Sequence, residues 1–181
     1  MKSVAILVLS FALLACSQMP GADRTSAAAG ASAPSATDAE FLRNISHANL
    51  AEIATGKLAA QKAQSPQVKQ FGQHMVDEHS ALETEGSALA QAKALRPPTS
   101  PDLRHQAAMK KLELVSGDNF DREYMQQMVK DHTDTLALLQ AAATKASDAQ
   151  LRQLAQKAIP HVQQHLAMAQ RLAGEVVGNA K

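Results

Sequence analysis

The chain has 181 residues, of which 45% are apolar, 19% are charged and only 3% are aromatic. This length allows one compact domain, and the scarcity of aromatic residues argues against a sheet-rich fold. The formal net charge of +1 comes from well-mixed basic and acidic residues, which removes the main reason to expect nucleic-acid binding. A single cysteine excludes an internal disulfide and every multi-cysteine metal motif.

The first fifteen residues have the pattern of a bacterial export signal. Lys2 supplies a short positive segment, and the apolar run over residues 4–15 that follows is too short to span a bilayer. The run ends at Cys16 in a sequence that resembles a bacterial lipobox. We therefore expect residues 1–15 to be a lipoprotein signal peptide and Cys16 to be the lipidated first residue of the mature protein. The alternative is an ordinary signal peptide cleaved nearby, with Cys16 incidental.

The segment after the expected lipidation site indicates how the domain is held. Ser17 in the second mature position resembles the sorting pattern for the outer membrane, so we expect a lipoprotein that faces the periplasm. The acyl chains would then be its contact with the membrane. Residues 16–37 are rich in Ala, Ser, Gly and Pro and have no apolar periodicity, which predicts a disordered tether.

Two long helices are expected next along the chain. Thr37 and Glu40 form a capping-box pattern, which predicts a helix over residues 37–64. The Ser65-Pro66 pair has the residue types of an N-cap followed by a first helical residue, which predicts a second helix over residues 65–94.

A proline-rich break at residues 96–101 separates these helices from the rest of the chain. A shorter helix is expected over residues 102–115, ended by the Ser-Gly pair that follows it. Two more long helices are expected, over residues 118–146 and from Asp148 to about Gly174.

The apolar residues of the four long helices repeat in alternating steps of three and four, which is the pattern of a left-handed bundle. The predicted fold class is therefore all-α, with residues 38–176 forming a four-helix bundle. The long connection between the second and third long helices contains the short extra helix and is long enough to cross the bundle lengthwise.

Each of the four apolar seams contains one ionisable residue near the middle of its helix. These residues are Glu52, His79, His132 and His165. Because the middles of packed helices stay level whichever way the neighbours run, we expect the four groups to converge at one height in the core. Three other histidines fall outside the seams and are expected to be solvated: His47, His74 and His105.

Short motifs along all four long helices carry a family resemblance. They comprise residues 49–53 (Asn-Leu-Ala-Glu-Ile), Val68, Phe71, Met75, His79, Ser116, Gly117, Phe120, Asp121, Tyr124, Asp131, His132, Ile159, Pro160, His165 and Leu166. With them, residues 38–172 resemble the bacterial domain-of-unknown-function family 4142. The resemblance implies a ferritin-like helical architecture and an exported setting, and it implies no particular reaction. Glu78 departs from the family pattern, which more often has Asp before this histidine.

One hypothesis for the converging groups is a metal site. An unpaired buried carboxylate costs several kcal/mol, so Glu52 would need a cation or hydrogen-bond donors. Three neutral imidazoles and one carboxylate suit a single ion of zinc, copper or iron. Soft ligands or supporting groups could come from Met75, Met128, His161, Asp131, Glu78 and Asn49. Sulfur beside imidazole favours copper.

The interpretation adopted from the sequence is a buried polar network, with the metal site as its alternative. In this network the imidazoles donate to Glu52, Tyr124 or Asp131 and fix the helix register. The protein would then be a binding or structural module of the cell envelope. Beyond this polar layer we identify no catalytic constellation in the sequence. A di-iron oxidase is disfavoured because valine stands three residues before His79, His132 and His165, where that pattern requires glutamate.

Overall fold

The computed structural model describes residues 34–178, which contain five α-helices and no strand. The helices are α1 (Ala36–Lys62), α2 (Pro66–Ala92), α3 (Leu103–Leu114), α4 (Gly117–Lys145) and α5 (Ala149–Gly178). The predicted all-α fold class is confirmed. Cys16, the expected signal peptide and the expected tether up to residue 33 lie outside the described residues. None of the described helices is long and apolar enough to cross a membrane.

The first helix starts earlier than the capping-box pattern predicts. The hydroxyl of Ser35 accepts a hydrogen bond from the backbone N–H of Asp38 at 3.1 Å, so Ser35 is the N-cap and Thr37 already lies inside α1. The start of α2 follows the prediction, because Ser65 is its N-cap and Pro66 its first residue. A proline is tolerated there because the first helical N–H has no partner within the helix.

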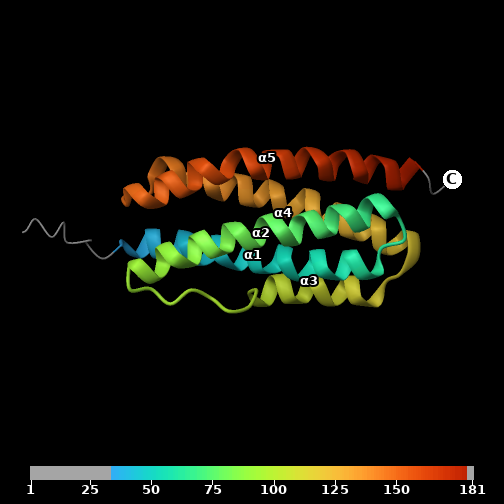
Figure 1. Ribbon diagram of the computed structural model, residues 1–181, viewed down its shortest axis with the longest axis horizontal. Coiled ribbons are helices and arrows are strands. Elements are labelled where there is room, and N and C mark those ends of the chain that lie inside the picture. Colours follow the sequence, from blue (N-terminus) through green and yellow to red (C-terminus); the bar gives the residue numbers. More distant parts are fainter. Residues whose placement is uncertain (1–33, 179–181) are drawn as a thin grey trace, which may run out of the picture. The chain divides into compact units, whose positions relative to one another are not determined.

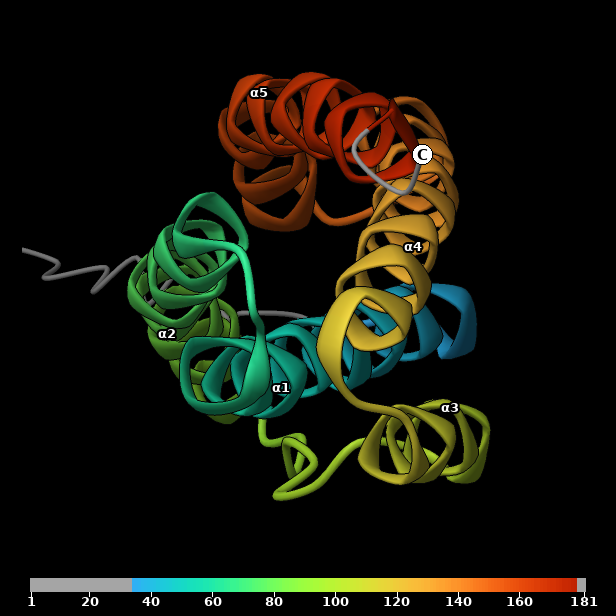
Figure 2. The ribbon, with the colours of Figure 1, turned by 90° about the vertical axis from the view of Figure 1, so that its right-hand side faces the viewer.

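The four long helices form two hairpins that lie side by side, α1 with α2 and α4 with α5 (Figures 1 and 2). The hairpins contact each other through α1 with α4 and through α2 with α5. The short α3 packs on the outside, against α1 and α4. The segment that contains α3 runs back along the long helices, so that α4 starts near the end of α1.

The buried apolar residues form two clusters, one near each end of the long helices. One cluster includes Val68 at the start of α2, Phe120 at the start of α4 and Leu172 near the end of α5. The other includes Leu42 at the start of α1 and Leu151 at the start of α5. Burying side chains of this size contributes roughly 1.5–3 kcal/mol each. The ionisable residues of the seams lie between the two clusters.

Helices α1 and α2 approach each other closely through two glycines. A Cβ atom added to Gly56 would lie 2.7 Å from the carbonyl oxygen of Gly72. A Cβ atom added to Gly72 would lie 2.8 Å from the Cβ atom of Ala59. Real Cβ atoms do not approach this closely, so the contact requires that both positions lack a side chain.

Two buried carboxylates connect the hairpins at their turns. Asp38 on α1 accepts hydrogen bonds from the backbone N–H groups of residues 147–148, in the turn between α4 and α5, at 3.0 and 2.9 Å. Asp121 on α4 accepts hydrogen bonds from the backbone N–H groups of residues 64–65, in the turn between α1 and α2, at 2.9 and 2.7 Å. Each hairpin therefore supplies the group that satisfies the turn of the other.

Candidate metal centre

Three imidazole rings from three helices meet in the core between the apolar clusters. His79 comes from α2, His132 from α4 and His165 from α5, and each is only 1% exposed. The ring centroids are 5.2–5.5 Å apart. One nitrogen of each ring lies within 4.8 Å of a nitrogen of both other rings. We refer to these three residues as the inner site.

The hydrogen bond of His79 identifies which of its nitrogens carries the proton. His79 Nδ1 lies 3.0 Å from Asn49 Oδ1. The amide nitrogen of Asn49 donates to Glu83 Oε2 at 3.4 Å, which directs the amide oxygen toward His79. An amide oxygen only accepts, so Nδ1 carries the proton and Nε2 keeps its lone pair. This buried Nε2 has no hydrogen-bond partner among the described residues.

His132 and His165 show the same division between their two nitrogens. His132 Nδ1 donates to the backbone carbonyl of Met128 at 2.8 Å, and its buried Nε2 has no partner among residues 34–178. His165 Nε2 lies 3.5 Å from the Glu78 carboxylate, which favours the proton on Nε2. The buried Nδ1 of His165 has no partner within the same described range.

Burial keeps the three rings uncharged. Desolvation lowers the pKa of His79 well below its usual value, and the neighbouring rings of His132 and His165 lower it further. Desolvation also lowers the pKa of His132, against the opposing effects of the Met128 carbonyl and Asp131. The pKa of His165 falls to about 4, chiefly through desolvation and the His132 ring. At neutral pH each ring therefore offers a free lone pair, which is the state that binds metals.

Glu52 lies beside the inner site without joining it. Its Oε1 is 3.9 Å from His132 Nδ1, which is too long for a hydrogen bond. Burial raises the pKa of Glu52 well above its usual value, and Asp131 raises it further, which favours the uncharged carboxyl. The three rings converge as expected, and Glu52 lies at the same height beside them, but its carboxyl is not one of the three groups whose ligand atoms lie within 4.8 Å of one another. The seam pattern of α1 reveals neither this burial nor the neighbouring Asp131.

The other candidate residues have different surroundings. Asn49 orients His79, as described above. Asp131 accepts a hydrogen bond from the side chain of Gln127 at 2.7 Å. Met75 and Met128 are fully buried in the apolar cluster that includes Phe120.

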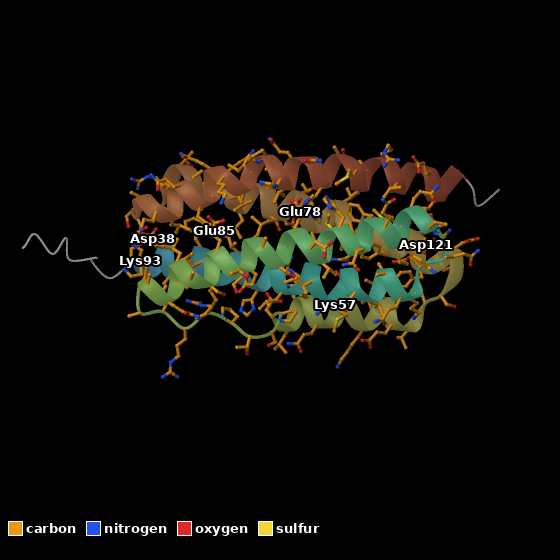
Figure 3. All side chains as sticks on the ribbon, in the orientation of Figure 1. Asp38, Lys57, Glu78, Glu85, Lys93 and Asp121 are labelled. Atoms are coloured by element: carbon orange, nitrogen blue, oxygen red, sulfur yellow. The ribbon has the colours of Figure 1, made fainter. Side chains whose placement is uncertain are left out.

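His161 does not point into the core, and its side chain is 45% exposed. Its Nδ1 lies 3.0 Å from Glu78 Oε2, so this ring pairs with a carboxylate of α2 across the groove between the helices. Figure 3 shows Glu78 on the side of α2 that faces α5.

The expectation that His47, His74 and His105 are solvated is wrong, since none of the three is exposed. His74 is half-buried, and its ring centroid lies 5.3 Å from that of His165. His105 is 8% exposed, with Nδ1 2.8 Å from Asp102 Oδ1. For His74 a sequence signal existed, because His74 and Glu78 are four residues apart and so lie on one face of their helix.

Solved structures with the same fold include three proteins of low sequence identity. A DUF305 protein from Streptomyces coelicolor is 15% identical, with a TM-score of 0.66 over 77% of this chain and 93% of that chain. CopM in the Cu(II)-bound form is 18% identical, with a TM-score of 0.64 over 76% of this chain and 96% of that chain. A DUF305 fragment from Deinococcus radiodurans is 13% identical, with a TM-score of 0.66 over 78% of this chain and 98% of that chain. At these identities the similarity concerns the fold alone.

The comparison with curated proteins finds no match. The comparison with family models finds one, described as a domain of unknown function (DUF4142), over residues 23–172. This range covers most of the chain and includes all residues of the inner site. The chain therefore belongs to the DUF4142 family.

Proposed function

We propose that this protein binds a transition-metal ion through His79, His132 and His165. The observation that carries the proposal is that, in each ring, one nitrogen is held by an acceptor and the other is free. The held nitrogen contacts an acceptor, and the free nitrogen is buried without a partner among the described residues. Metal-binding histidines characteristically donate their second N–H to a carbonyl or carboxylate, which fixes the ring orientation.

The contacts of the rings do not support the alternative of a structural network. That hypothesis requires the imidazoles to donate to Glu52, Tyr124 or Asp131. Within residues 34–178, Glu52 Oε2 and the Tyr124 hydroxyl are themselves buried without partners. An unsatisfied buried polar group costs about 1–3 kcal/mol, so a purely structural layer would carry this penalty at all three rings. An ion bound by the three rings would supply a partner that their free nitrogens lack.

The spacing and chemistry of the rings favour copper or zinc. Imidazole nitrogens bound to one zinc ion at 2.0–2.1 Å are about 3.3 Å apart in a tetrahedral site. The inner-site nitrogens lie within 4.8 Å of one another, so small side-chain rotations bring them to this separation. Copper is the first ion to test, because CopM has the same fold and was solved in a Cu(II)-bound form. Sulfur ligands would favour copper further, and Met75 and Met128 each precede an inner-site histidine by one helical turn.

Metal binding is tested with the untagged protein after dialysis against a chelator. We expect one equivalent of Cu(II) in calorimetric titration and a raised melting temperature. At a free ion concentration one hundred times Kd, the free energy of unfolding should rise by about 2.7 kcal/mol. His79→Gln and His132→Gln should each abolish tight binding. His47→Gln is the matched control, because His47 is half-buried, donates to the backbone carbonyl of Ser100 at 3.0 Å and is not part of the inner site. Wild-type protein that binds neither Cu(II) nor Zn(II) would overturn the proposal.

We also propose that the protein is exported and anchored by lipid at Cys16, in the outer membrane and facing the periplasm. The support is the apolar run before Cys16 and the short sequence around it. Mass spectrometry of the membrane fraction should show a diacylated N-terminus. The Cys16→Ser variant should accumulate as unprocessed or soluble protein, and a wild-type mass without lipid would refute the anchor.

A further inference from the structure

A second group of metal-binding side chains lies next to the inner site and shares one residue with it. His74, Glu78 and His165 each offer a ligand atom within 4.8 Å of the other two. Glu78 Oε2 lies 3.5 Å from His165 Nε2, and the ring of His74 packs edge-on against that of His165. We refer to these three residues as the outer site. Nitrogen and carboxylate ligands of this kind suit Zn²⁺ and Cu²⁺.

The outer site is open to solvent, in contrast to the inner one. The side chain of Glu78 is 33% exposed, and His74 is half-buried. His74 also lines a surface groove of about 390 Å³ between α2 and α5, together with Gln70, Gln164 and Met168. Ions from solvent therefore reach His74 and Glu78 directly, whereas each inner-site ring is 1% exposed.

His161 holds the carboxylate of the outer site in place. Its Nδ1 lies 3.0 Å from the same Glu78 oxygen that faces His165. Glu78 on α2 is thus fixed between two histidines that are one turn apart on α5. The two histidines thereby orient the Glu78 carboxylate, which could otherwise adopt many rotamers at the surface.

We propose that the outer site of His74, Glu78 and His165 receives the metal ion from solvent and passes it to the inner site through His165. The proposal rests on the proposed function and adds the route by which the ion reaches the core. A neutral imidazole has a single lone pair, so His165 serves one ion at a time. The proton of His165 lies on Nδ1 while Nε2 binds the ion beside Glu78, and it returns to Nε2 when the ion moves to Nδ1 in the inner site. The two sites together should therefore hold one tightly bound ion.

The first experiment measures how fast the metal-free, untagged protein takes up Cu(II), by stopped-flow absorbance. His74→Gln removes an outer ligand and leaves all three inner-site residues in place. We expect its association rate to fall by about tenfold while its equilibrium Kd changes little. The control variant His47→Gln should load at the wild-type rate. Uptake by His74→Gln at the wild-type rate would overturn the loading role.

The second experiment isolates the outer site by removing two inner ligands, in the variant His79→Gln/His132→Gln. We expect this variant to retain one equivalent of Cu(II) with an affinity at least tenfold weaker than wild type. Adding His74→Gln should abolish the remaining binding. Circular dichroism establishes that each variant is folded before the titration.

The outcomes separate the two proposals. If the wild type binds one Cu(II) ion and the isolated outer site binds none, the outer site is wrong and the proposed function stands. If the isolated outer site binds as tightly as the wild type, the inner site is wrong as the principal site and the outer site stands. If the wild type binds no ion, both are wrong.

Discussion

The two helical hairpins have turns of the same length but are packed in different ways. Counted from their turns, Gly56 and Gly72 of the first hairpin correspond to Leu139 and Ala155 of the second. The first hairpin closes by contact between backbones, since an added Cβ atom at either glycine would lie within 2.8 Å of a neighbouring atom. The second closes by contact between side chains, with Leu139 and Ala155 both buried. Turns of one length can therefore join helices through two kinds of interface, one in which backbones touch and one in which side chains fill the space.

Truncating a buried side chain in the second hairpin should lower the free energy of unfolding by the largest amount. Leu139 is 2% exposed within the apolar cluster at its end of the bundle. Leu139→Ala leaves a cavity there and should lower the free energy of unfolding by about 3 kcal/mol. Urea denaturation followed by circular dichroism measures this loss. The exposed Leu103 provides a matched control, and Leu103→Ala should change stability by less than about 0.5 kcal/mol.

Adding a side chain to the first hairpin should be harmful for the opposite reason. In Gly72→Ala, the new methyl group would meet Ala59 Cβ and the Gly56 carbonyl oxygen, both at 2.8 Å. We expect a loss of about 2 kcal/mol, because backbone atoms cannot move aside as flexible side chains do. The same denaturation experiment measures it. A neutral or stabilising effect would show that the backbones can separate without penalty, and would remove the contrast between the hairpins.

Replacing a carboxylate that accepts hydrogen bonds from a turn should lower the free energy of unfolding by an intermediate amount that depends on pH. Burial alone would raise the pKa of Asp38, but hydrogen bonds from Ser147, Asp148 and Ser35 outweigh it and lower the pKa. A lowered pKa in the folded state adds stability above the unfolded value of about 3.9, and this stability is lost as the pH falls through the folded value. Asp38→Asn should therefore cost about 1–2 kcal/mol at pH 7 and progressively less below pH 4. Denaturation curves of both proteins across this pH range measure the difference, and a constant difference would contradict the assignment.

The smallest expected effect is a gain in stability. Gly86 lies on α2 at the position that corresponds to Ala169 on α5, and a Cβ atom added there would meet nothing within 4 Å. Gly86→Ala makes the first hairpin more like the second at a position with room for the change. We expect stabilisation by about 0.5–1 kcal/mol, from the better helix propensity of alanine. Thermal melting measures this stabilisation. A loss of stability would mean that the α1–α2 interface depends on glycine at Gly86 as well as at Gly56 and Gly72.

Much of this arrangement could be predicted from the sequence. The five helices follow from regular apolar spacing and from strong break signals, such as the prolines at residues 97, 98 and 101. That three histidines meet in the core follows from their positions in the middles of the apolar seams.

The remainder of the site depends on neighbours that come from distant parts of the chain. His74 is off the seam of α2, but the antiparallel α5 packs against that flank and brings His165 next to it. Glu52 is in its seam, but burial among the packed helices raises the pKa of its carboxyl, and Asp131 from α4 raises it further. A helical wheel describes one helix at a time. It therefore places His74 and Glu52 on a face of their own helix but does not show which residues of other helices pack against them.

The reciprocal contacts of Asp38 and Asp121 have a consequence for how the domain is assembled. Each hairpin lacks the acceptor for its own turn and obtains it from the other, so the two halves are complementary fragments rather than independent units. The connecting segment that contains α3 joins the two hairpins covalently but supplies neither of these acceptors. Cleavage of that connection by a protease should consequently leave the two halves associated, with the histidines of the inner site still brought together from both fragments.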